Sequence, residues 1–587
     1  MAPPAADSKP FLRASLWLCG LAWTVPLLQP VHRFPLASFY SEWLAFALAL
    51  AAVLPLLRRE PWRDATVPAV ALAPLALIVV LAAQVALGRV PYAEQAQTAG
   101  LYLLWTALLI WLGHQLRRGL APAEIATTLA WFLLGGGLLS ALVGLAQHYS
   151  LATGADFLVM RKEWPVIYGN LGQPNHYAAY VSLSLASAAY LYSRRALHGA
   201  VAAGCSALFL MVLALAASRS PWLYLAAFIV LSQWLHGLRA DDGSRRLAVA
   251  ALWLLPGFIA AQWLVTLPFL APDEAAVLTS ARRLFQVASG IEPRLELWGE
   301  AWRMFLAAPL LGAGFGQFAW HHFLQQAAGG GTAAPGVYHN AHNIVLQLMA
   351  ETGIAGAAVI VGAALLWLAD LRRAAGDIER GWLLALLAVI GIHSLLEYPL
   401  WYAYFLGVAA LLLGFGAERH FAVRHAGLAR AAVGLVTLVG CVNLAAVVPP
   451  YRDFERLVFT GGPVAPGAAN AQAFEQAMMR AHREPLLTPY VELAFAMSAK
   501  VDETQLQDKL ALVERAVHFA PVDVVAYRHA LLLALAGAHA AARAQLERAL
   551  RAYPDETAAI AAELEELARR HPAAFTPLLE LTASKLR

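Results

Sequence analysis

The chain has 587 residues, of which 60% are hydrophobic and only 14% are charged. Soluble domains carry about 25% charged residues, so this composition excludes an ordinary soluble globular protein. The formal net charge of +4 comes from basic residues spread along the chain, which excludes the gathered basic patch of a nucleic-acid-binding protein. The cysteines Cys19, Cys205 and Cys441 stand singly in apolar runs. They indicate small buried hydrophobic residues and neither a disulfide nor a metal site.

Apolar runs long enough to cross a bilayer recur from the N-terminus to about residue 449. A crossing needs about 20 apolar residues, so the sequence predicts an all-α polytopic membrane protein with about thirteen transmembrane helices. Lys9 and Arg13 precede the first run, but no small-residue cleavage site follows it, so we expect a retained helix and not a signal peptide. The predicted spans are residues 14–30, 36–57, 67–88, 98–115, 124–149, 175–193, 199–217, 221–237, 248–269, 343–369, 381–396, 400–417 and 426–449.

Basic residues predict the orientation of these spans. Short loops rich in Lys and Arg stay in the cytoplasm, and such a loop follows every even-numbered span. The N-terminus and these loops therefore share the cytoplasmic side. Four polar segments, and everything after residue 450, lie on the opposite side, which is the periplasm of a Gram-negative cell. These segments are residues 150–174, 218–221, 270–342 and 397–402.

The chain changes character near residue 450, where charge rises and soluble amphipathic helices are expected. The segment Glu514–Pro521 recurs as Glu547–Pro554, a spacing typical of helix-pair repeats. We therefore expect a transmembrane domain over residues 1–449, with a large periplasmic loop at 270–342, and a periplasmic TPR-like helical domain over 450–587. Such repeats bind peptides or partner proteins, and the alternative is a helical cap that only covers the membrane domain.

Candidate functional residues gather on the predicted outer side. Segment 168–176 reads Tyr-Gly-Asn-Leu-Gly-Gln-Pro-Asn-His, which indicates a shaped, hydrogen-bonding turn. A helix cap formed by Asn175 would account for part of it, but not for Gln173 and His176. Arg219 stands alone between two apolar runs, where an arginine is costly and usually marks a functional site. Snorkelling to lipid phosphate is the alternative for Arg219.

The loop 270–342 contains Arg282, Arg283, Arg294 and Arg303. An apolar face at helical spacing follows Arg294, which predicts a helix lying at the membrane interface. Guanidinium groups bind phosphate oxygens bidentately, so arginines of this loop are candidates for binding a phosphate group. For Arg282 and Arg283, a solvated basic face is the favoured interpretation. The glycines at 312, 314 and 316 lack a preceding strand and are too closely spaced for a nucleotide fingerprint, so we expect a tight turn beside the site.

His339 and His342 end this loop within Tyr-His-Asn-Ala-His-Asn. Two histidines can bind zinc, but no Cys, carboxylate or metalloprotease motif accompanies them, so metal binding is the weaker interpretation. A histidine near neutral pKa suits general base chemistry on a hydroxyl. The outer turn Glu397–Tyr402 adds a carboxylate, a phenol and aromatic walls, although Trp401 and Tyr402 also fit membrane-interface anchors.

These residues resemble motifs of the bacterial O-antigen ligase and polymerase superfamily. His342-Asn343, nine residues, Gly353, two residues and Gly356 match the superfamily's ligase motif in full. Ser218-Arg219-Ser220 and Arg294 with Trp298 are similar to its two arginine sites. Segments 169–176 and 397–402, and the helical extension, resemble the branch of protein O-oligosaccharyltransferases that glycosylate pilins.

The resemblance implies a metal-independent membrane glycosyltransferase in the bacterial inner membrane, with no cofactor and its active site facing the periplasm. It implies en bloc transfer of an oligosaccharide from undecaprenyl diphosphate to Ser or Thr hydroxyls of a periplasmic, pilin-like protein. His342 would be the base, and Arg219 and Arg294 would hold the diphosphate. Substrate contacts would come from the remaining site residues, which are Gln173, Asn175, His176, His339, Asn343, Glu397 and Tyr398.

Four alternatives stay open at this stage. An O-antigen ligase would transfer to lipid A-core, and an O-antigen polymerase would transfer to another carrier-linked glycan. A transporter would place charges at mid-membrane, whereas here polar residues gather at one face. A scaffold that recruits partners through its helical tail would tolerate replacement of His342. The sequence determines neither the glycan nor the acceptor nor the oligomeric state.

Overall fold

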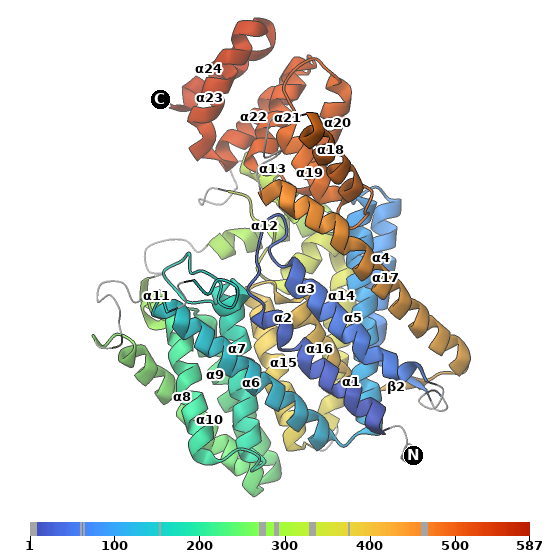
Figure 1. The fold of residues 1–587 in the computed structure, drawn as a ribbon, viewed down its shortest axis with the longest axis vertical. Coiled ribbons are helices and arrows are strands. Elements are labelled where there is room, and N and C mark those ends of the chain that lie inside the picture. Colours follow the sequence, from blue (N-terminus) through green and yellow to red (C-terminus); the bar gives the residue numbers. More distant parts are fainter. Residues whose placement is uncertain are drawn as a thin grey trace. The chain divides into compact units, whose positions relative to one another are not determined.

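A computed structural model describes residues 9–58, 62, 65–151, 154–268, 270, 278–286, 293–327, 336–373, 376–459 and 468–586. Nearly all regular structure in these residues is helical (Figure 1), which confirms the predicted all-α fold class. Two short strands, β1 (Thr66–Pro68) and β2 (His420–Ala422), pair antiparallel with Val67 opposite Phe421.

The chain folds into two compact units, each built from separate stretches of sequence. The first unit comprises residues 1–75, 102–290 and 360–445, and the second comprises 76–101, 291–359 and 446–587. Neither unit matches the predicted division at residue 450, which stays a prediction. Helices α4 (Leu72–Ala86), α5 (Ala93–Gly119), α14 (Ile344–Arg373) and α17 (Ala426–Phe459) contribute residues to both units.

The other helices belong to one unit each. The first unit contains α1 (Lys9–Ala22), α2 (Val25–Leu28), α3 (Phe39–Val53), α6 (Pro122–His148), α7 (Pro174–Ser193), α8 (Gly199–Leu215), α9 (Ser220–Arg239), α10 (Asp242–Leu264), α11 (Ser280–Gln286), α15 (Ile378–Leu396) and α16 (Ala403–Phe415), with short 3₁₀ turns at Leu54–Leu57, Ala69–Ala71, Gly169–Leu171 and Pro399–Trp401. The second contains α12 (Pro293–Ala307), α13 (Phe318–Ala327), α18 (Ala468–His482), α19 (Thr488–Ser498), α20 (Leu506–Phe519), α21 (Asp523–Leu535), α22 (His539–Ala552), α23 (Thr557–Arg570) and α24 (Pro572–Leu586), with a 3₁₀ turn at Pro554–Glu556.

Every predicted span overlaps helical structure, so the chain is a polytopic membrane protein. Nine helical segments of the described chain are long and apolar enough to cross a bilayer, and α8 and α16 are shorter apolar helices. The remaining two predicted spans correspond to α7 and α9, which have 20 residues each but fall outside these sets. The count of thirteen therefore stays a prediction. The first predicted span is broken at Trp23–Thr24 into α1 and α2.

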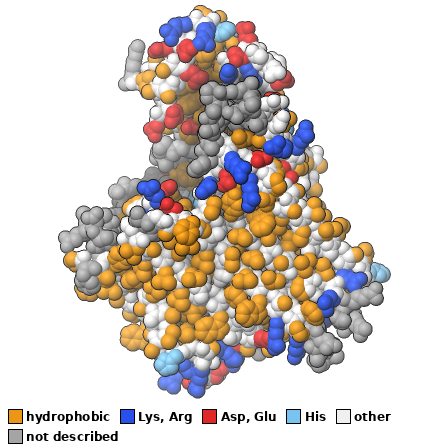
Figure 2. Space-filling view, viewed as in Figure 1, with side chains coloured by type: hydrophobic (Ala, Val, Ile, Leu, Met, Phe, Trp, Pro, Cys, Tyr) orange, Lys and Arg blue, Asp and Glu red, His pale blue; other side chains and the backbone are white. Residues whose placement is uncertain are grey.

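Large hydrophobic side chains on the outer surface of the first unit are suited to lipid. Trp253 and Trp263 of α10 are 70% and 66% exposed, and Val230 of α9 is 66% exposed. Figure 2 shows hydrophobic side chains over much of the visible helix surface, with Lys and Arg side chains at the lower end, in the middle and at the top of the view. Such a broad apolar surface would promote aggregation in water. It is stable in a bilayer, because the backbone polar groups of each helix are hydrogen-bonded within that helix.

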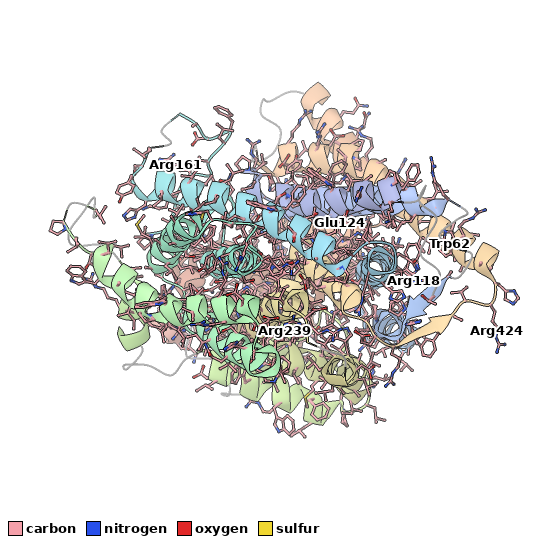
Figure 3. The ribbon with its side chains drawn as sticks, turned by 90° about the horizontal axis from the view of Figure 1, so that it is seen from below. Trp62, Arg118, Glu124, Arg161, Arg239 and Arg424 are labelled. Atoms are coloured by element: carbon pink, nitrogen blue, oxygen red, sulfur yellow. The ribbon has the colours of Figure 1, made fainter. Side chains whose placement is uncertain are left out.

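Some segments predicted to be cytoplasmic contact one another within the first unit. Arg13 of the N-terminal helix pairs with Glu124 at 2.6 Å, and Arg195 pairs with Asp242 at 2.8 Å. Figure 3 views the molecule from below and shows Arg118, Glu124 and Arg239 on α5, α6 and α9. The predicted alternation of the chain across the membrane stays a prediction.

The helices after α17 pack as consecutive neighbours, with α20 on α21, α21 on α22 and α23 on α24. Each copy of the repeated segment covers the end of a helix, α20 or α22. The last residue of each copy is a proline, Pro521 or Pro554, which lies two residues beyond the helix. The two copies contact each other, because the Tyr553 hydroxyl donates a hydrogen bond to the carbonyl of Pro521 at 2.5 Å. The assignment of these helices to a TPR-like class stays a prediction.

Candidate functional site

The predicted site residues fall into two groups, one in each unit. Gln173, Asn175, His176, Arg219, Glu397 and Tyr398 lie in the first unit, and Arg294, His339, His342 and Asn343 lie in the second.

Gln173 begins helix α7. Its backbone is extended, and its side-chain oxygen accepts a hydrogen bond from the His176 backbone N–H at 2.6 Å. Pro174 occupies the first helical position, which suits its fixed φ and missing N–H. The alternative in which Asn175 caps the helix is therefore wrong, because the capping oxygen comes from Gln173 and leaves the Asn175 amide for other contacts.

Asn175 connects three segments of the first unit that are predicted to lie on the outer side. Its amide nitrogen donates to Oε1 of Glu397 at 2.8 Å, and its amide oxygen accepts from the Ser218 hydroxyl at 2.8 Å. Glu397 and Ser218 are both buried, with 4% and 1% of their surface exposed. The segments 168–176, 218–221 and 397–402 are thus connected side chain to side chain, as expected for parts of one site.

His176 is buried within a group of aromatic rings. Its ring centroid lies 4.7 Å from that of Tyr402 and 5.3 Å from that of Phe405, both in edge-to-face arrangements. Tyr398 stacks on Tyr402 with a centroid distance of 6.1 Å. Burial, together with the neighbouring Glu397 carboxylate, raises the pKa of the Tyr398 phenol. Tyr398 therefore stays neutral and can donate a hydrogen bond, whereas His176 packs against this aromatic wall.

Arg219 immediately precedes α9 and is half-buried. Buried serines flank it, and Ala217 has a left-handed backbone with φ of 52° that turns the chain out of α8. The Ser218 carbonyl accepts a hydrogen bond from the Ser280 hydroxyl of α11 at 2.5 Å. Arg219 is therefore presented by a turn that α11 and Asn175 both hold.

His342 occupies the turn before α14 in the second unit. Its backbone is left-handed, with φ of 54°, a conformation that non-glycine residues adopt rarely and that clusters at functional sites. Asn343 caps α14, since its side-chain oxygen accepts from the backbone N–H groups of Val345 and Leu346 at 3.1 and 3.2 Å. Gln347 reaches back and accepts from the Ala341 N–H at 2.6 Å. These bonds fix the unusual backbone that presents the half-buried imidazole.

Gly353 kinks helix α14, with φ of 63° and ψ of −163°. Essentially only glycine adopts this region, and a Cβ atom here would lie 2.5 Å from the carbonyl carbon of Leu310. The adjoining glycine turn packs against the kink, because the Gly314 N–H donates to the Glu351 carbonyl at 3.1 Å. Gly312, Gly314 and Gly316 all have positive φ, which confirms that this segment is a turn.

Arg294 lies in the first turn of α12, as the helical pattern predicted, and is half-buried. The apolar face of α12 packs Leu297 and Ala301 against Phe318 of α13. Glu300 lies on the same face, fully buried, and contacts the fully buried His322 of α13. His339 is exposed.

Sequence interpretation missed Ser280, Glu300, His322 and Gln347. Glu300 was detectable in principle, because it lies three residues after Leu297 and four before Met304 on an apolar face. The long-range partners of the other three residues cannot be inferred from spacing. No cluster of three or more His, Cys, Asp or Glu side chains suited to a metal occurs among the described residues, and metal independence stays a prediction.

Comparison with known proteins supports the class of protein that this fold and these motifs define. Residues 201–361 match the family described as O-antigen ligase, and residues 167–192 match the family described as protein glycosylation ligase. Residues 381–566 match a family described as virulence factor membrane-bound polymerase, C-terminal. The matched regions include Arg219, Arg294 and His342 in the first family and Gln173 in the second. The resemblance to O-antigen ligases and protein glycosylation ligases is therefore confirmed.

One curated relative is similar over about two thirds of the chain. The protein named General O-oligosaccharyltransferase of Acinetobacter baylyi is 29% identical over 402 residues, which are 68% of this chain and 68% of the relative.

Proposed function

We propose that this protein is an inner-membrane oligosaccharyltransferase that transfers a glycan en bloc from undecaprenyl diphosphate to Ser or Thr hydroxyls of periplasmic proteins such as pilins. The observation that carries this proposal is the complete His342–Gly356 motif in a chain similar to a protein named as a general O-oligosaccharyltransferase. The predicted topology places His342 on the periplasmic side, where the lipid carrier and exported proteins are both available.

In the proposed reaction, His342 accepts the proton of the acceptor hydroxyl as its oxygen attacks the anomeric carbon of the glycan. The bond between that carbon and the diphosphate oxygen breaks, and undecaprenyl diphosphate leaves with the bonding electrons. Arg219 and Arg294 bind the diphosphate and stabilise its growing charge. The left-handed backbone of His342 and the Asn343 cap of α14 support this role, since they hold the turn that presents the imidazole.

The other predicted site residues receive two kinds of role in this proposal. Tyr398 and His339 contact substrate, because the neutral Tyr398 phenol can donate a hydrogen bond and His339 is exposed. Gln173, Asn175, His176, Asn343 and Glu397 shape the site, because each is buried or engaged in the contacts described above.

A polymerase is the second candidate, because residues 381–566 match a family described as a membrane-bound polymerase. Its acceptor would be a second carrier-linked glycan in place of a protein. An O-antigen ligase, with lipid A-core as the acceptor, shares the same His342 motif. The similarity of residues 167–192 to protein glycosylation ligases favours the protein acceptor.

The test supplies one carrier-linked glycan to three strains that offer a pilin, lipid A-core or additional carrier-linked glycan. Glycosylated pilin supports the proposal, whereas modified lipid A-core or lengthened glycan identifies the ligase or the polymerase. His342→Ala should lower transfer about 10²-fold or more, the usual contribution of a general base. His539→Ala is the matched control, because His539 is exposed on α22. Near-normal transfer by His342→Ala would reject the proposed base.

A further inference from the structure

Helix α13 lies within the segment 270–342, which ends at His342. Phe318 and Phe323 of this helix are both fully buried, and they lie five residues apart, which places them on different faces. Phe318 packs with Leu297 and Ala301 of α12. Phe323 packs with Leu531 and Leu546 of α21 and α22. Within the second unit, α13 is thus held between α12 and the C-terminal helices.

His322 projects from α13 on the same face as Phe318, four residues earlier. The two rings are stacked, with centroids 6.3 Å apart and planes 10° apart. Nδ1 of His322 contacts Oε2 of Glu300, and both side chains are completely buried. Because both polar side chains are removed from water, their contact stabilises the packing of α12 against α13.

The ring contacts continue from His322 to His342. The Tyr338 ring meets His322 edge to face with centroids 5.7 Å apart. The same Tyr338 ring meets His342 with centroids 6.2 Å apart and planes 72° apart. His342 is therefore constrained on its backbone side by the Asn343 cap and on its ring side by Tyr338, which rests on His322.

We propose that Glu300 and His322 are positioning residues that orient the His342 imidazole through Tyr338. This inference rests on the proposed role of His342 as the base. Neither residue needs to touch substrate. Loss of the pair should leave donor binding unchanged and lower the rate of the chemical step, because a displacement of about 1 Å can cost about 10²-fold in rate.

The experiment measures kcat and the donor KM of the purified full-length protein, together with its thermal unfolding midpoint. His322→Phe retains a ring against Phe318 and Tyr338 but leaves the Glu300 carboxylate unpaired. Glu300→Leu with His322→Phe removes the unpaired polar group and retains an apolar core. We expect both proteins to show a 10- to 100-fold lower kcat with the donor KM changed less than twofold. Glu300→Gln keeps a hydrogen-bond acceptor in a side chain of the same shape, and should retain most of the unsubstituted rate.

His482→Phe is the matched control, since it breaks another His–Glu pair of the second unit, with Nε2 of His482 3.2 Å from Oε1 of Glu492. It should leave kcat unchanged. A folded double variant with normal kcat would overturn the proposal, and so would an equal loss of kcat in His482→Phe. If His342→Ala keeps full activity, the proposed function itself fails. If His342→Ala is inactive while the Glu300 and His322 variants are normal, only the positioning role fails.

Discussion

At the scale of single residues, an arginine can bind a diphosphate in a way that a lysine cannot. Its planar guanidinium offers a rigid fork of N–H donors that matches two phosphate oxygens, whereas an ammonium is a compact point charge. Arg294 is half-buried in the first turn of α12, so its approach to a ligand is restricted by the helix that carries it. For diphosphate binding, the planar geometry of the guanidinium therefore matters more than its charge.

Arg294→Lys should therefore lose about tenfold or more in transfer rate, although charge is conserved. The rate is measured with purified protein and carrier-linked glycan, and Arg303→Lys is the matched control on the same helix. Arg303 is exposed, and its Nε donates to Gln325 at 2.9 Å, so its replacement should have little effect. Normal transfer by Arg294→Lys would reject the proposed diphosphate contact.

At the scale of elements, the His342–Gly356 motif describes one kinked helix. Asn343 caps the helix, nine residues form its first turns, and Gly353 bends it where Leu310 and Gly312 approach. The spacing of the motif thus fixes the distance along the helix between the His342 turn and the glycine turn. A change at Gly353 should consequently act on folding as well as on chemistry.

Gly353→Ala should destabilise the protein by about 2 kcal/mol or more, because it combines a forbidden backbone region with a clash in a packed turn. Thermal unfolding of the purified protein measures the change. Gly362→Ala is the control on the same helix, since a Cβ atom at Gly362 would meet nothing within 4 Å. That control should be neutral or slightly stabilising. Equal midpoints for the two variants would contradict the structural role of Gly353.

The elements also show which parts of the fold the sequence could predict. The spans followed from apolar run length, and the helix after Arg294 followed from its periodicity. The helices α11 and α13 were missed because they are short and their burial depends on distant partners. Among site residues, the clustering of segments 168–176, 218–221 and 397–402 followed from topology. The pairing of Asn175 with Glu397 did not, because hydrogen-bond partners 222 residues apart leave no periodic signal.

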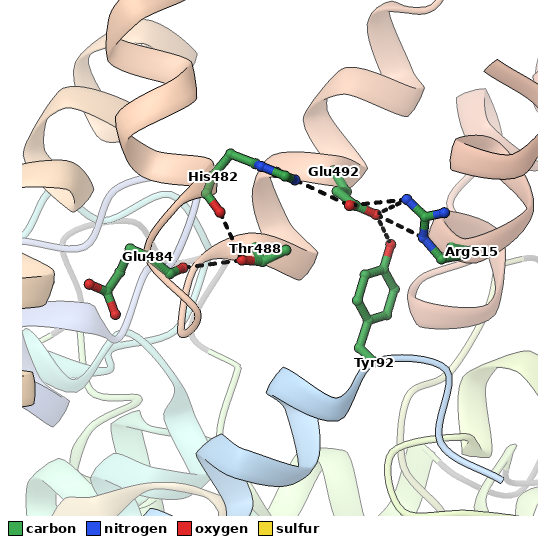
Figure 4. A network of polar contacts seen from close by, with 6 residues as sticks. All are labelled: Tyr92, His482, Glu484, Thr488, Glu492 and Arg515. Atoms are coloured by element: carbon green, nitrogen blue, oxygen red, sulfur yellow. Dashed lines mark hydrogen bonds and ion pairs between the residues drawn. The ribbon is translucent and has the colours of Figure 1, made fainter. Parts of the chain in front are cut away.

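At the scale of the whole molecule, one polar network ties a loop of the membrane region to the C-terminal helices within the second unit. The Tyr92 hydroxyl donates to Glu492 of α19 at 2.8 Å, and Arg515 of α20 donates to the same carboxylate at 3.0 Å (Figure 4). The predicted topology places the Tyr92 loop and these helices on the same side of the membrane. The network therefore holds the tail against a loop between two predicted spans.

The charge of Glu492 makes this contact sensitive to pH. Burial alone would raise the pKa of the Glu492 carboxyl, but hydrogen bonds from Tyr92, His482 and Arg515 together lower it. The unfolded chain then binds a proton at higher pH than the folded protein does. The stabilisation by Glu492 is present above the unfolded pKa of about 4.3 and is lost as pH falls through the folded value.

The carboxyl of Glu484 has the opposite effect on stability, although only the Glu484 backbone carbonyl is bonded beside this network, to the Thr488 hydroxyl. Burial raises the pKa of the Glu484 carboxyl, so its ionised form costs stability at neutral pH.

Glu492→Gln should lower the unfolding midpoint at pH 7 and flatten the loss of stability below about pH 5. Glu484→Gln should raise the midpoint at pH 7. Unfolding of the full-length protein between pH 3 and about pH 7 measures both, and a Glu492→Gln midpoint that equals the unsubstituted value at pH 7 would show that the network does not stabilise the C-terminal helices.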